Sequence, residues 1–427
     1  MPARLPVSIL AFYSVCSLTA MAPMNIGFFL VFFFFLVLSL QRKNAYPADL
    51  GSLPEFKTYL VSGSLLFGAC LLSLSFARIL PVSYAGHAPD ITVHGFLKIW
   101  YLFCPLVLAS VFARSAGTED DLKLIVRFWW AMTCVLALVA VVQFYTGWPI
   151  AQVIPTNPNH FHAILFFGHH LSTSSIIIFP AFTALSVALG SFSRNRKILK
   201  TASVVACLGL LILFLSYART AWLAIPIGLI LVFARHLKPK TLAAYCLGLF
   251  AMMGLASQTP LLKERIQNSM GIQDRFRLWE ANIDFFKHNP ITGIGWLKTQ
   301  EMSEFYFKSI DPEHYHDYFW GHAHSNFFEM LGGTGLIGLF AFLAWSYFTF
   351  RLAYRTAKLA EAQKFFYLSD FSWGLGVALA LLHFNGLTNV TFWEGKVMHQ
   401  QMWAIALLLM VQLILKRGSF DARSDLS

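Results

Sequence analysis

The chain reads GHAHSNFFEMLGGTGLIGLF from Gly321 to Phe340, where a polar segment passes into a long apolar run. His322 and His324 stand before the run, and four glycines follow inside it: Gly332, Gly333, Gly335 and Gly338. A histidine at such a boundary can exchange protons near neutral pH. The glycines predict a surface on which another helix packs closely. The stretch therefore predicts a membrane helix that begins at a chemically active polar surface.

The composition of the whole chain extends this prediction. Of its 427 residues, 57% are hydrophobic and 12% charged, whereas a soluble domain carries roughly 25% charged residues. The apolar runs are continuous rather than alternating, which favours helices over a β-barrel; they include Asn25–Leu40, Thr58–Ala77, Thr201–Tyr217 and Gln400–Leu415. We expect an all-α polytopic membrane protein with about 12 transmembrane helices, forming a single transmembrane domain over residues 1–427.

The net charge of +11 is a topology signal rather than a sign of nucleic-acid binding. The basic residues cluster in alternate short connections, as expected for cytoplasmic loops: Arg42-Lys43, Arg194 to Lys200, Arg235 to Lys240, Arg355 to Lys364 and Lys416-Arg417. Both termini are then cytoplasmic. The external segments are about 78–95, 146–170, 258–325 and 388–399, and the third is one large insertion between spans 9 and 10. Twelve of the fourteen histidines lie in or beside these segments.

The cysteines and the N-terminal segment indicate how the chain is expected to be oxidised and processed. All six cysteines lie in apolar runs and none forms a CxxC pair, so neither disulfides nor a zinc ribbon are expected. Arg4, the apolar run from Leu5 and the sequence Ala20-Met21-Ala22 have the form of a signal peptide. A retained first helix is the favoured interpretation.

Two arginines are candidate anion ligands. Arg219 lies in SYARTAWLA between two apolar runs with almost no connection, which predicts a guanidinium at the external surface, against the positive-inside bias. Arg275 follows Asp274, which is expected to cap a helix ending near Lys287. On that helix Arg275 lies amid an apolar face made by Phe276, Trp279, Ile283 and Phe286, with Arg277 on the solvated side. Arginine suits bidentate binding of phosphate; snorkelling at the membrane interface is the structural alternative for both.

His324 is the candidate general base, because it needs only an unprotonated nitrogen near a substrate hydroxyl. His322 and Ser325 beside it are possible supporting residues, as is Glu329, whose carboxylate is costly in a helix unless paired. His322 with His324 and His314 with His316 have metal-ligand spacing, but no HExxH motif or acidic cluster accompanies them. No metal or other cofactor is therefore expected.

Other charged residues have weaker arguments. Arg78 and Lys98 flank the first external segment and could add positive charge to the same site. Asp90 lies in that segment and competes with His324 as the base. Glu119-Asp120-Asp121 has the form of an acidic metal motif, but topology places it in the cytoplasm beside Lys123, as a solvated loop.

The chain resembles the O-antigen ligase and O-antigen polymerase superfamily of bacterial envelopes. The resemblance rests on Arg219 in SYARTAWLA, on Arg275-x-x-x-Trp279 with HNPITGIG (residues 288–295), and on His324-Ser325-x9-Gly335-x-x-Gly338. Motif similarity covers about 220–340, and architecture nearly the whole chain. Members often have Asn after the histidine, where this chain has Ser325, and Gln with a later Glu on the next helix, where it has Glu329 and Gly333.

The resemblance implies a GT-C-like glycosyltransferase of the inner membrane, with its active site on the periplasmic side. Such an enzyme moves a glycan from undecaprenyl diphosphate to an acceptor hydroxyl, inverting the anomeric carbon without a metal. His324 would be the base; Arg219, Arg275, Arg78 and Lys98 would bind the donor diphosphate. GHHLSTSS (residues 168–175) and the His-Ser pair favour a ligase acting on lipid A-core.

Three alternatives stay open at this point. A polymerase of the same superfamily would use another lipid-linked repeat as acceptor, and a protein ligase would use a pilin-type protein. A lipid-linked glycan transporter would show internal repeats and midplane polar residues. No repeat with a period of 20–50 residues is found in the sequence.

Overall fold

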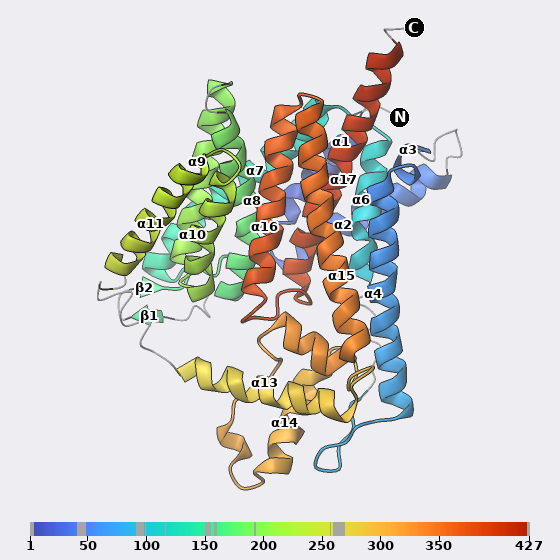
Figure 1. Cartoon of the computed structure of the whole chain (residues 1–427), viewed down its shortest axis with the longest axis vertical. Coiled ribbons are helices and arrows are strands. Elements are labelled where there is room, and N and C mark those ends of the chain that lie inside the picture. Colours follow the sequence, from blue (N-terminus) through green and yellow to red (C-terminus); the bar gives the residue numbers. More distant parts are fainter. Residues whose placement is uncertain are drawn as a thin grey trace.

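The computed structural model describes residues 4–40, 48–90, 98, 100–115, 117–149, 155–157, 160–191, 194–256, 258 and 270–424. Within these ranges seven helices are long and apolar enough to cross a membrane. They are α2 (Met21–Leu40), α4 (Pro54–Ile79), α7 (Glu119–Thr146), α8 (His170–Ser191), α9 (Arg196–Leu215), α15 (Asn326–Ala362) and α17 (Gly395–Ser424). The chain is an all-α, multi-pass membrane protein (Figure 1).

Shorter or more polar helices run alongside these spans in the same bundle (Figure 1). They are α1 (Leu5–Cys16), α6 (Cys104–Ala113) after the 3-10 turn η1 (Trp100–Phe103), α10 (Arg219–Phe233), α11 (Pro239–Ala256) and α16 (Phe366–Asn385). The small elements are α3 (Ala48–Gly51) and an antiparallel pair, β1 (Pro155–Asn157) with β2 (His160–Phe161). Because α1, α6 and α10 are shorter than the roughly 17 residues of a straight crossing, the count of about 12 spans stays a prediction.

The centre of the bundle is formed by α8 and α17. Nearly every side chain in their apolar stretches is buried, whereas fewer than half of those of α2 and α9 are buried. Exposed apolar side chains on a spanning helix are suited to contact with lipid. The helix α1 reaches the core through Tyr13, whose hydroxyl lies 3.1 Å from Nδ1 of His399 in α17.

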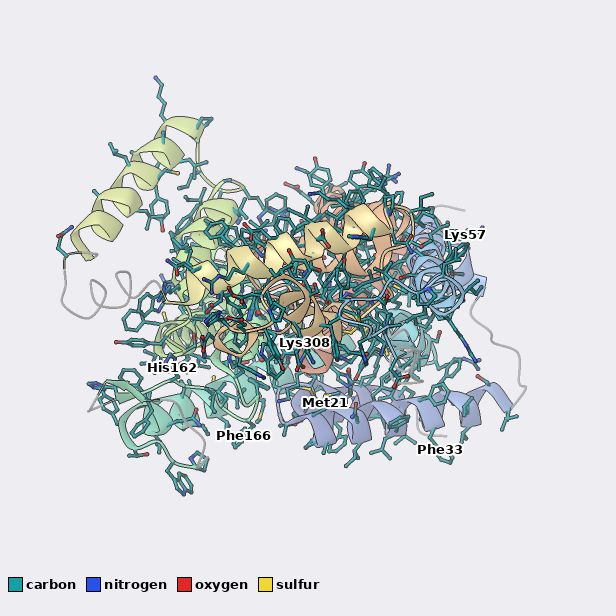
Figure 2. All side chains as sticks on the ribbon, turned by 90° about the horizontal axis from the view of Figure 1, so that it is seen from below. Met21, Phe33, Lys57, His162, Phe166 and Lys308 are labelled. Carbon is teal, nitrogen blue, oxygen red and sulfur yellow. The ribbon has the colours of Figure 1, made fainter. Side chains whose placement is uncertain are left out.

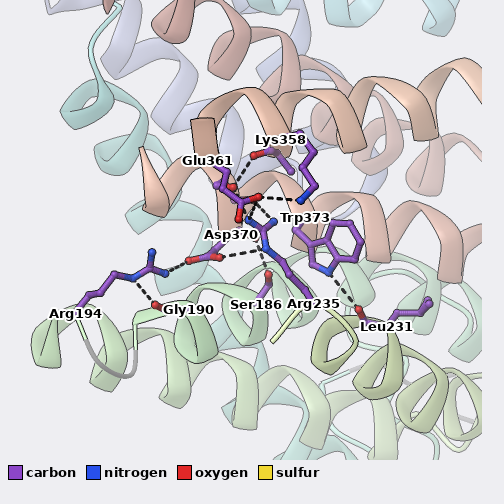
Figure 3. Close-up of polar contacts among 11 residues, drawn as sticks. Ser186, Gly190, Arg194, Leu231, Arg235, Lys358, Glu361, Asp370 and Trp373 are labelled. Carbon is purple, nitrogen blue, oxygen red and sulfur yellow. Dashed lines mark hydrogen bonds and ion pairs between the residues drawn. The ribbon is translucent and has the colours of Figure 1, made fainter. Parts of the chain in front are cut away.

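An ion-pair network at the upper end of the bundle joins α15 and α16 to the connections that follow α8 and α10 (Figure 3). Asp370, near the start of α16 and 3% exposed, lies 2.5 Å from Nη2 of Arg194 and 3.8 Å from Nε of Arg235. Arg235 also lies 3.6 Å from Glu361 at the end of α15. Three of the predicted basic connections therefore meet at this end, where α17 also terminates (Figure 1).

At the opposite end, two helices of the segment 258–325 lie across the bundle: α13 (Met270–His288) and α14 (Thr299–Ile310), which precedes the 3-10 turn η2 (Tyr315–Asp317). Figure 2, seen from below, shows α13 crossing the end of the bundle, with Lys308 of α14 near its middle. Tyr84, Ala281, Phe285, Ile294 and Met302 form a small separate core here.

Two details of the α13 prediction were wrong. The helix begins at Met270, so Asp274 lies inside it and does not cap it. The face that packs against the protein contains Leu278, Ala281 and Phe285, each 0% exposed, while Phe276 of the predicted face is 54% exposed. Amphipathic periodicity defines an apolar stripe, but it does not say which edge of the stripe meets protein and which stays outside.

The glycines of α15 pack against another helix, as predicted, and also against a loop. Gly335 has φ 63° and breaks the helix, and the loop 290–295 enters this break. The carbonyls of Gly332 and Gly333 accept hydrogen bonds from the N–H groups of Ile294 and Gly295, both at 3.0 Å. A Cβ on Gly335 would meet the Ile291 carbonyl carbon at 2.5 Å. Gly333 and Gly335 therefore seat the HNPITGIG loop, whereas Gly332 lies against the helix α13, where an added Cβ would meet the Asn282 carbonyl oxygen at 3.0 Å.

Candidate functional site

A cavity of about 510 Å³ lies at the end of the bundle that α13 and α14 cover. Its walls come from the loop before α15, the start of α14, the start of α8 and the connection between α16 and α17, together with Lys98. His322, His324 and Glu329 all line it. The structure thus brings the predicted base, two possible supporting residues and one predicted cation to one space.

His324 has a strained backbone and an incompletely bonded ring. Its φ is 47°, in the left-handed region that costs a non-glycine residue about 1–2 kcal/mol. Its N–H donates to Nδ1 of His322 at 3.2 Å, and the two ring centroids are 4.3 Å apart. Nδ1 of His324 is buried without a hydrogen-bond partner among the described residues. Nε2 is therefore the nitrogen through which this ring meets the cavity.

The peptide groups of Ala323, between the two histidines, are held from both sides. The N–H of Ala323 donates to Oε2 of Glu329 at 2.9 Å, and its carbonyl accepts from Nε1 of Trp279 at 2.9 Å. Glu329 is 4% exposed, and its other oxygen accepts a short hydrogen bond from Thr299. Trp279 in turn stacks on Phe328. Residues of α13, α14 and α15 therefore fix the backbone that carries His324.

Burial favours the neutral form of both histidines, His322 and His324. It lowers the pKa of His324 to about 3, and His322, Arg275 and His169 add to this effect. Burial also lowers the pKa of His322, which Glu329 partly offsets. Both rings are therefore neutral at physiological pH, and His324 has an unprotonated nitrogen that can accept a proton.

The two predicted arginine ligands lie close enough to affect each other. Arg219 is the first residue of α10, only a short turn after α9 ends at Leu215, as the sequence predicted. Arg275 is half-buried on α13, and burial together with the charge of Arg219 lowers its pKa. Within the described residues, no carboxylate forms an ion pair with Arg275. Two neighbouring guanidinium groups in partial burial are favourable for an anion.

Another wall of the cavity contains residues that sequence reasoning did not single out. Glu394 lies at the start of α17 and accepts a short hydrogen bond from the Ser172 hydroxyl of α8. Burial raises the pKa of Glu394, although Ser172 and the lysines Lys396 and Lys98 favour its charged form. The only sequence signals were the acidic residue in external segment 388–399 and the serine inside GHHLSTSS.

Asn326 connects this wall to the histidines. Its Oδ1 accepts from the N–H groups of Thr391 and Phe392 at 2.9 and 3.1 Å, and its Nδ2 donates to the Thr391 hydroxyl at 3.0 Å. Asn326 is two residues from His324, and Thr391 is three residues from Glu394. One side chain therefore sets the spacing between the two walls.

Several other predicted residues lie away from the cavity. Arg78 is exposed in the last turn of α4, and Asp90 is exposed, with its N–H donating to Glu301 of α14 at 2.9 Å; neither lines the cavity. His314 contacts Asp311 on the surface. Glu119 pairs with Lys123 at 2.9 Å in the first turn of α7. Across the described ranges, no three His, Cys, Asp or Glu side chains form a group suited to a metal ion.

Residues 202–343, from α9 into α15, match a family model described as O-antigen ligase. The match covers about a third of the chain, which is similar to the O-antigen ligase family over that segment. The matched segment contains Arg219, Arg275 and His324, whereas Lys98, Ser172 and Glu394 lie outside it. A search of curated proteins found no match. This similarity supports a glycan ligase or polymerase type of transferase acting on lipid-linked glycans.

Proposed function

We propose that the protein is an O-antigen ligase that moves a glycan from undecaprenyl diphosphate to a sugar hydroxyl of lipid A-core. The observation that carries this proposal is a neutral His324 that lines a cavity while lying within electrostatic reach of Arg275. The cavity supplies room for an acceptor, and the arginines supply charge for a diphosphate. The family match supports the class of reaction.

The chemistry needs one proton transfer and one displacement. Nε2 of His324 removes the proton of the acceptor hydroxyl while the oxygen attacks the anomeric carbon of the donor glycan. The bond from that carbon to the diphosphate oxygen breaks, and undecaprenyl diphosphate leaves with the electron pair. Attack from the side opposite the leaving group inverts the carbon. The negative charge gained by the leaving group is stabilised by Arg219 and Arg275.

Donor binding also tunes the base. In the unloaded site, burial and the positive charge of Arg275 hold the pKa of His324 near 3. A diphosphate beside Arg275 opposes that charge and favours the protonated imidazole, so the pKa of His324 rises. His324 therefore becomes a stronger base only when the leaving group is in place.

The location follows from the two ends of the bundle. Arg194 and Arg235 lie in connections at one end, and His324 lies in the cavity at the other. Because cytoplasmic connections carry the excess of Lys and Arg, we assign the cavity to the periplasmic face of the bacterial inner membrane.

In-vitro transfer tests the proposal with purified protein, undecaprenyl-diphosphate-linked glycan and lipid A-core, with EDTA present and no nucleotide. Wild type is expected to form product only with both lipids. Replacing His324 with Ala is expected to lower the rate by about 10²–10⁴-fold, the usual contribution of a general base. His314→Ala is the matched control, because His314 is exposed and does not line the cavity.

The same assay separates the alternatives. Longer lipid-linked glycan formed without lipid A-core would mean a polymerase, and transfer to an added pilin-type protein would mean a protein ligase. Retained transfer by His324→Ala, or loss of wild-type transfer in EDTA, would contradict the metal-free histidine mechanism.

A further inference from the structure

The cavity has polar groups that the transfer mechanism does not use. Oε1 of Glu394 accepts from Ser172, whereas Oε2 accepts no hydrogen bond from the described residues. Asn389, 6% exposed, makes no side-chain hydrogen bond within the same ranges. Both residues line the cavity and come from the connection between α16 and α17. A free carboxylate oxygen and a free amide in a recess are groups that bind hydroxyls.

Aromatic surface lies beside these groups. Trp320 lines the cavity from the loop before α15 and is 45% exposed, and Phe319 next to it is 51% exposed. Large exposed aromatic side chains in a recess offer a flat apolar face for a ligand that has polar edges. A carboxylate, an amide and an indole together match a sugar ring, which has hydroxyls on its edge and C–H groups on its faces.

The charge of the lining distinguishes the two substrates. Among the described lining residues, two side chains are acidic, Glu329 and Glu394, and one is basic, Lys98, while burial lowers the pKa of the three histidines and favours their neutral forms. This balance suits a diphosphate less well than the pair Arg219 and Arg275, which lies outside the lining. A neutral sugar has no such conflict. Lys98 lies within electrostatic reach of both carboxylates, so we reassign it from the diphosphate to this wall.

We propose that Glu394, Asn389 and Trp320 form the subsite for the acceptor, a neutral sugar whose hydroxyl pair is bound by the Glu394 carboxylate and whose face packs on the Trp320 ring. The inference rests on the proposed function, because it places the attacking hydroxyl in the cavity that His324 lines. Asn326 supports it by fixing the connection that carries Glu394 relative to the histidine loop.

Steady-state kinetics of the full-length protein test the subsite. Lipid A-core is varied at saturating undecaprenyl-diphosphate-linked glycan, and then the reverse. Glu394→Gln, which removes the charge and keeps the shape, is expected to raise the KM for lipid A-core about 10-fold or more, the usual loss for a hydrogen bond to a charged group. The KM for the donor should stay within about 2-fold, since the diphosphate lies elsewhere.

Glu301→Gln is the matched control. Glu301 lies on α14, binds Nζ of Lys298 at 3.1 Å and does not line the cavity. It is expected to leave both KM values unchanged. Circular dichroism and the thermal midpoint of each variant report whether the protein remains folded.

A second pair of variants keeps the test independent of Glu394. Because Trp320 is half exposed, Trp320→Ala should preserve the fold while raising the KM for lipid A-core. Trp320→Phe retains a flat ring and is expected to restore most of the acceptor affinity.

The outcomes separate the two proposals. Unchanged acceptor KM in both Glu394→Gln and Trp320→Ala, or a rise in donor KM instead, would overturn the subsite while wild-type transfer still supports the ligase. Absence of any wild-type transfer would overturn the proposed function and the subsite with it.

Discussion

In the proposed mechanism, the protonation of the His324 imidazole depends on whether the donor diphosphate occupies the neighbouring arginine pair. In the unloaded protein its pKa is about 3, so the reactive neutral form persists as pH falls through the range where an ordinary histidine, with a pKa near 6.5, becomes protonated. A diphosphate bound as proposed is expected to raise this pKa, so acid should inactivate the loaded protein at a higher pH than the free protein.

A pH series checks this expectation. The value of kcat/KM for the donor reports the free protein. Between pH 7 and pH 5 we expect no decrease in this value from protonation of His324. The value of kcat, which reports the loaded protein, should fall first. An acid limb in kcat/KM centred near pH 6.5 would show that burial does not hold the ring neutral.

Trp279 is a positioning residue for the same histidine. Trp279→Phe removes the N–H donated to Ala323 and keeps a ring that stacks on Phe328. Loss of one hydrogen bond of about 1–1.5 kcal/mol is expected to lower kcat by about 10-fold, with both KM values and the thermal midpoint nearly unchanged.

The control for Trp279 is Trp373→Phe. Its indole also donates to a backbone carbonyl, that of Leu231, but at the other end of the bundle (Figure 3). A fall in kcat for both variants would point to a general structural effect instead of a specific one on His324.

At the scale of elements, the broken helix α15 and the loop it receives form one unit. Gly335→Ala places a Cβ at φ 63° and against the carbonyl of Ile291. With ψ −161°, this backbone lies in a region essentially restricted to glycine, which costs alanine about 1–3 kcal/mol, and the clash adds to it. We expect a lower thermal midpoint and lower transfer, because the loop 290–295 precedes α14, whose start lines the cavity.

Gly248→Ala in α11 tests whether any added methyl group has this effect. Nothing lies within 4 Å of a Cβ at Gly248, and its backbone is helical. Alanine there is expected to leave activity unchanged and to stabilise the helix by roughly 0.5–1 kcal/mol. A similar loss of stability in both variants would contradict the role assigned to the break at Gly335.

The sequence predicted some helices accurately, but it did not predict the start of α13 or the break in α15. The spans around Thr58–Ala77 and the hairpin before Arg219 were predicted well, because continuous apolar runs and a single polar turn have few alternative structures. The start and packing face of α13 and the break at Gly335 were not predicted. Each depends on contacts with a segment remote in sequence, and local periodicity carries no information about them.

At the scale of the whole molecule, the ion network around Asp370 includes residues of α15 and α16. The opposite ends of these two helices adjoin the segments that line the cavity. Asp370→Asn leaves Arg194 and Arg235 without their shared carboxylate. Removing one partner of a buried pair costs about 3–5 kcal/mol; here on the order of 2–3 kcal/mol is expected, because Arg194 is partly exposed. The thermal midpoint should fall while kcat of the folded protein is retained.

Glu55→Gln provides the comparison for Asp370. It breaks the ion pair with Arg355, a 3.4 Å contact in which the arginine is half exposed. Such pairs contribute about 0–1 kcal/mol, so little change in the midpoint is expected. Equal losses in the two variants would mean that the buried network does not stabilise the bundle more than a surface pair.

The site was only partly predictable for a reason that applies to the molecule as a whole. His324 and Arg219 stand at boundaries between polar and apolar sequence, which a single pass along the chain detects. Glu394 and Ser172 meet only because α8 and α17 pack side by side at the centre of the fold. Such a contact between residues 222 positions apart has no local signal.

The three hydrogen bonds of Asn326 have a consequence for how this protein can be altered. Exchanging the connection between α16 and α17 for that of a homologue with another acceptor preference would also exchange the backbone groups that Asn326 holds. A graft of that connection alone would then place the new residues on a backbone that Asn326 no longer holds in position. If the proposed acceptor subsite is correct, a change of acceptor preference is expected to require exchange of this connection together with the segment that carries Asn326.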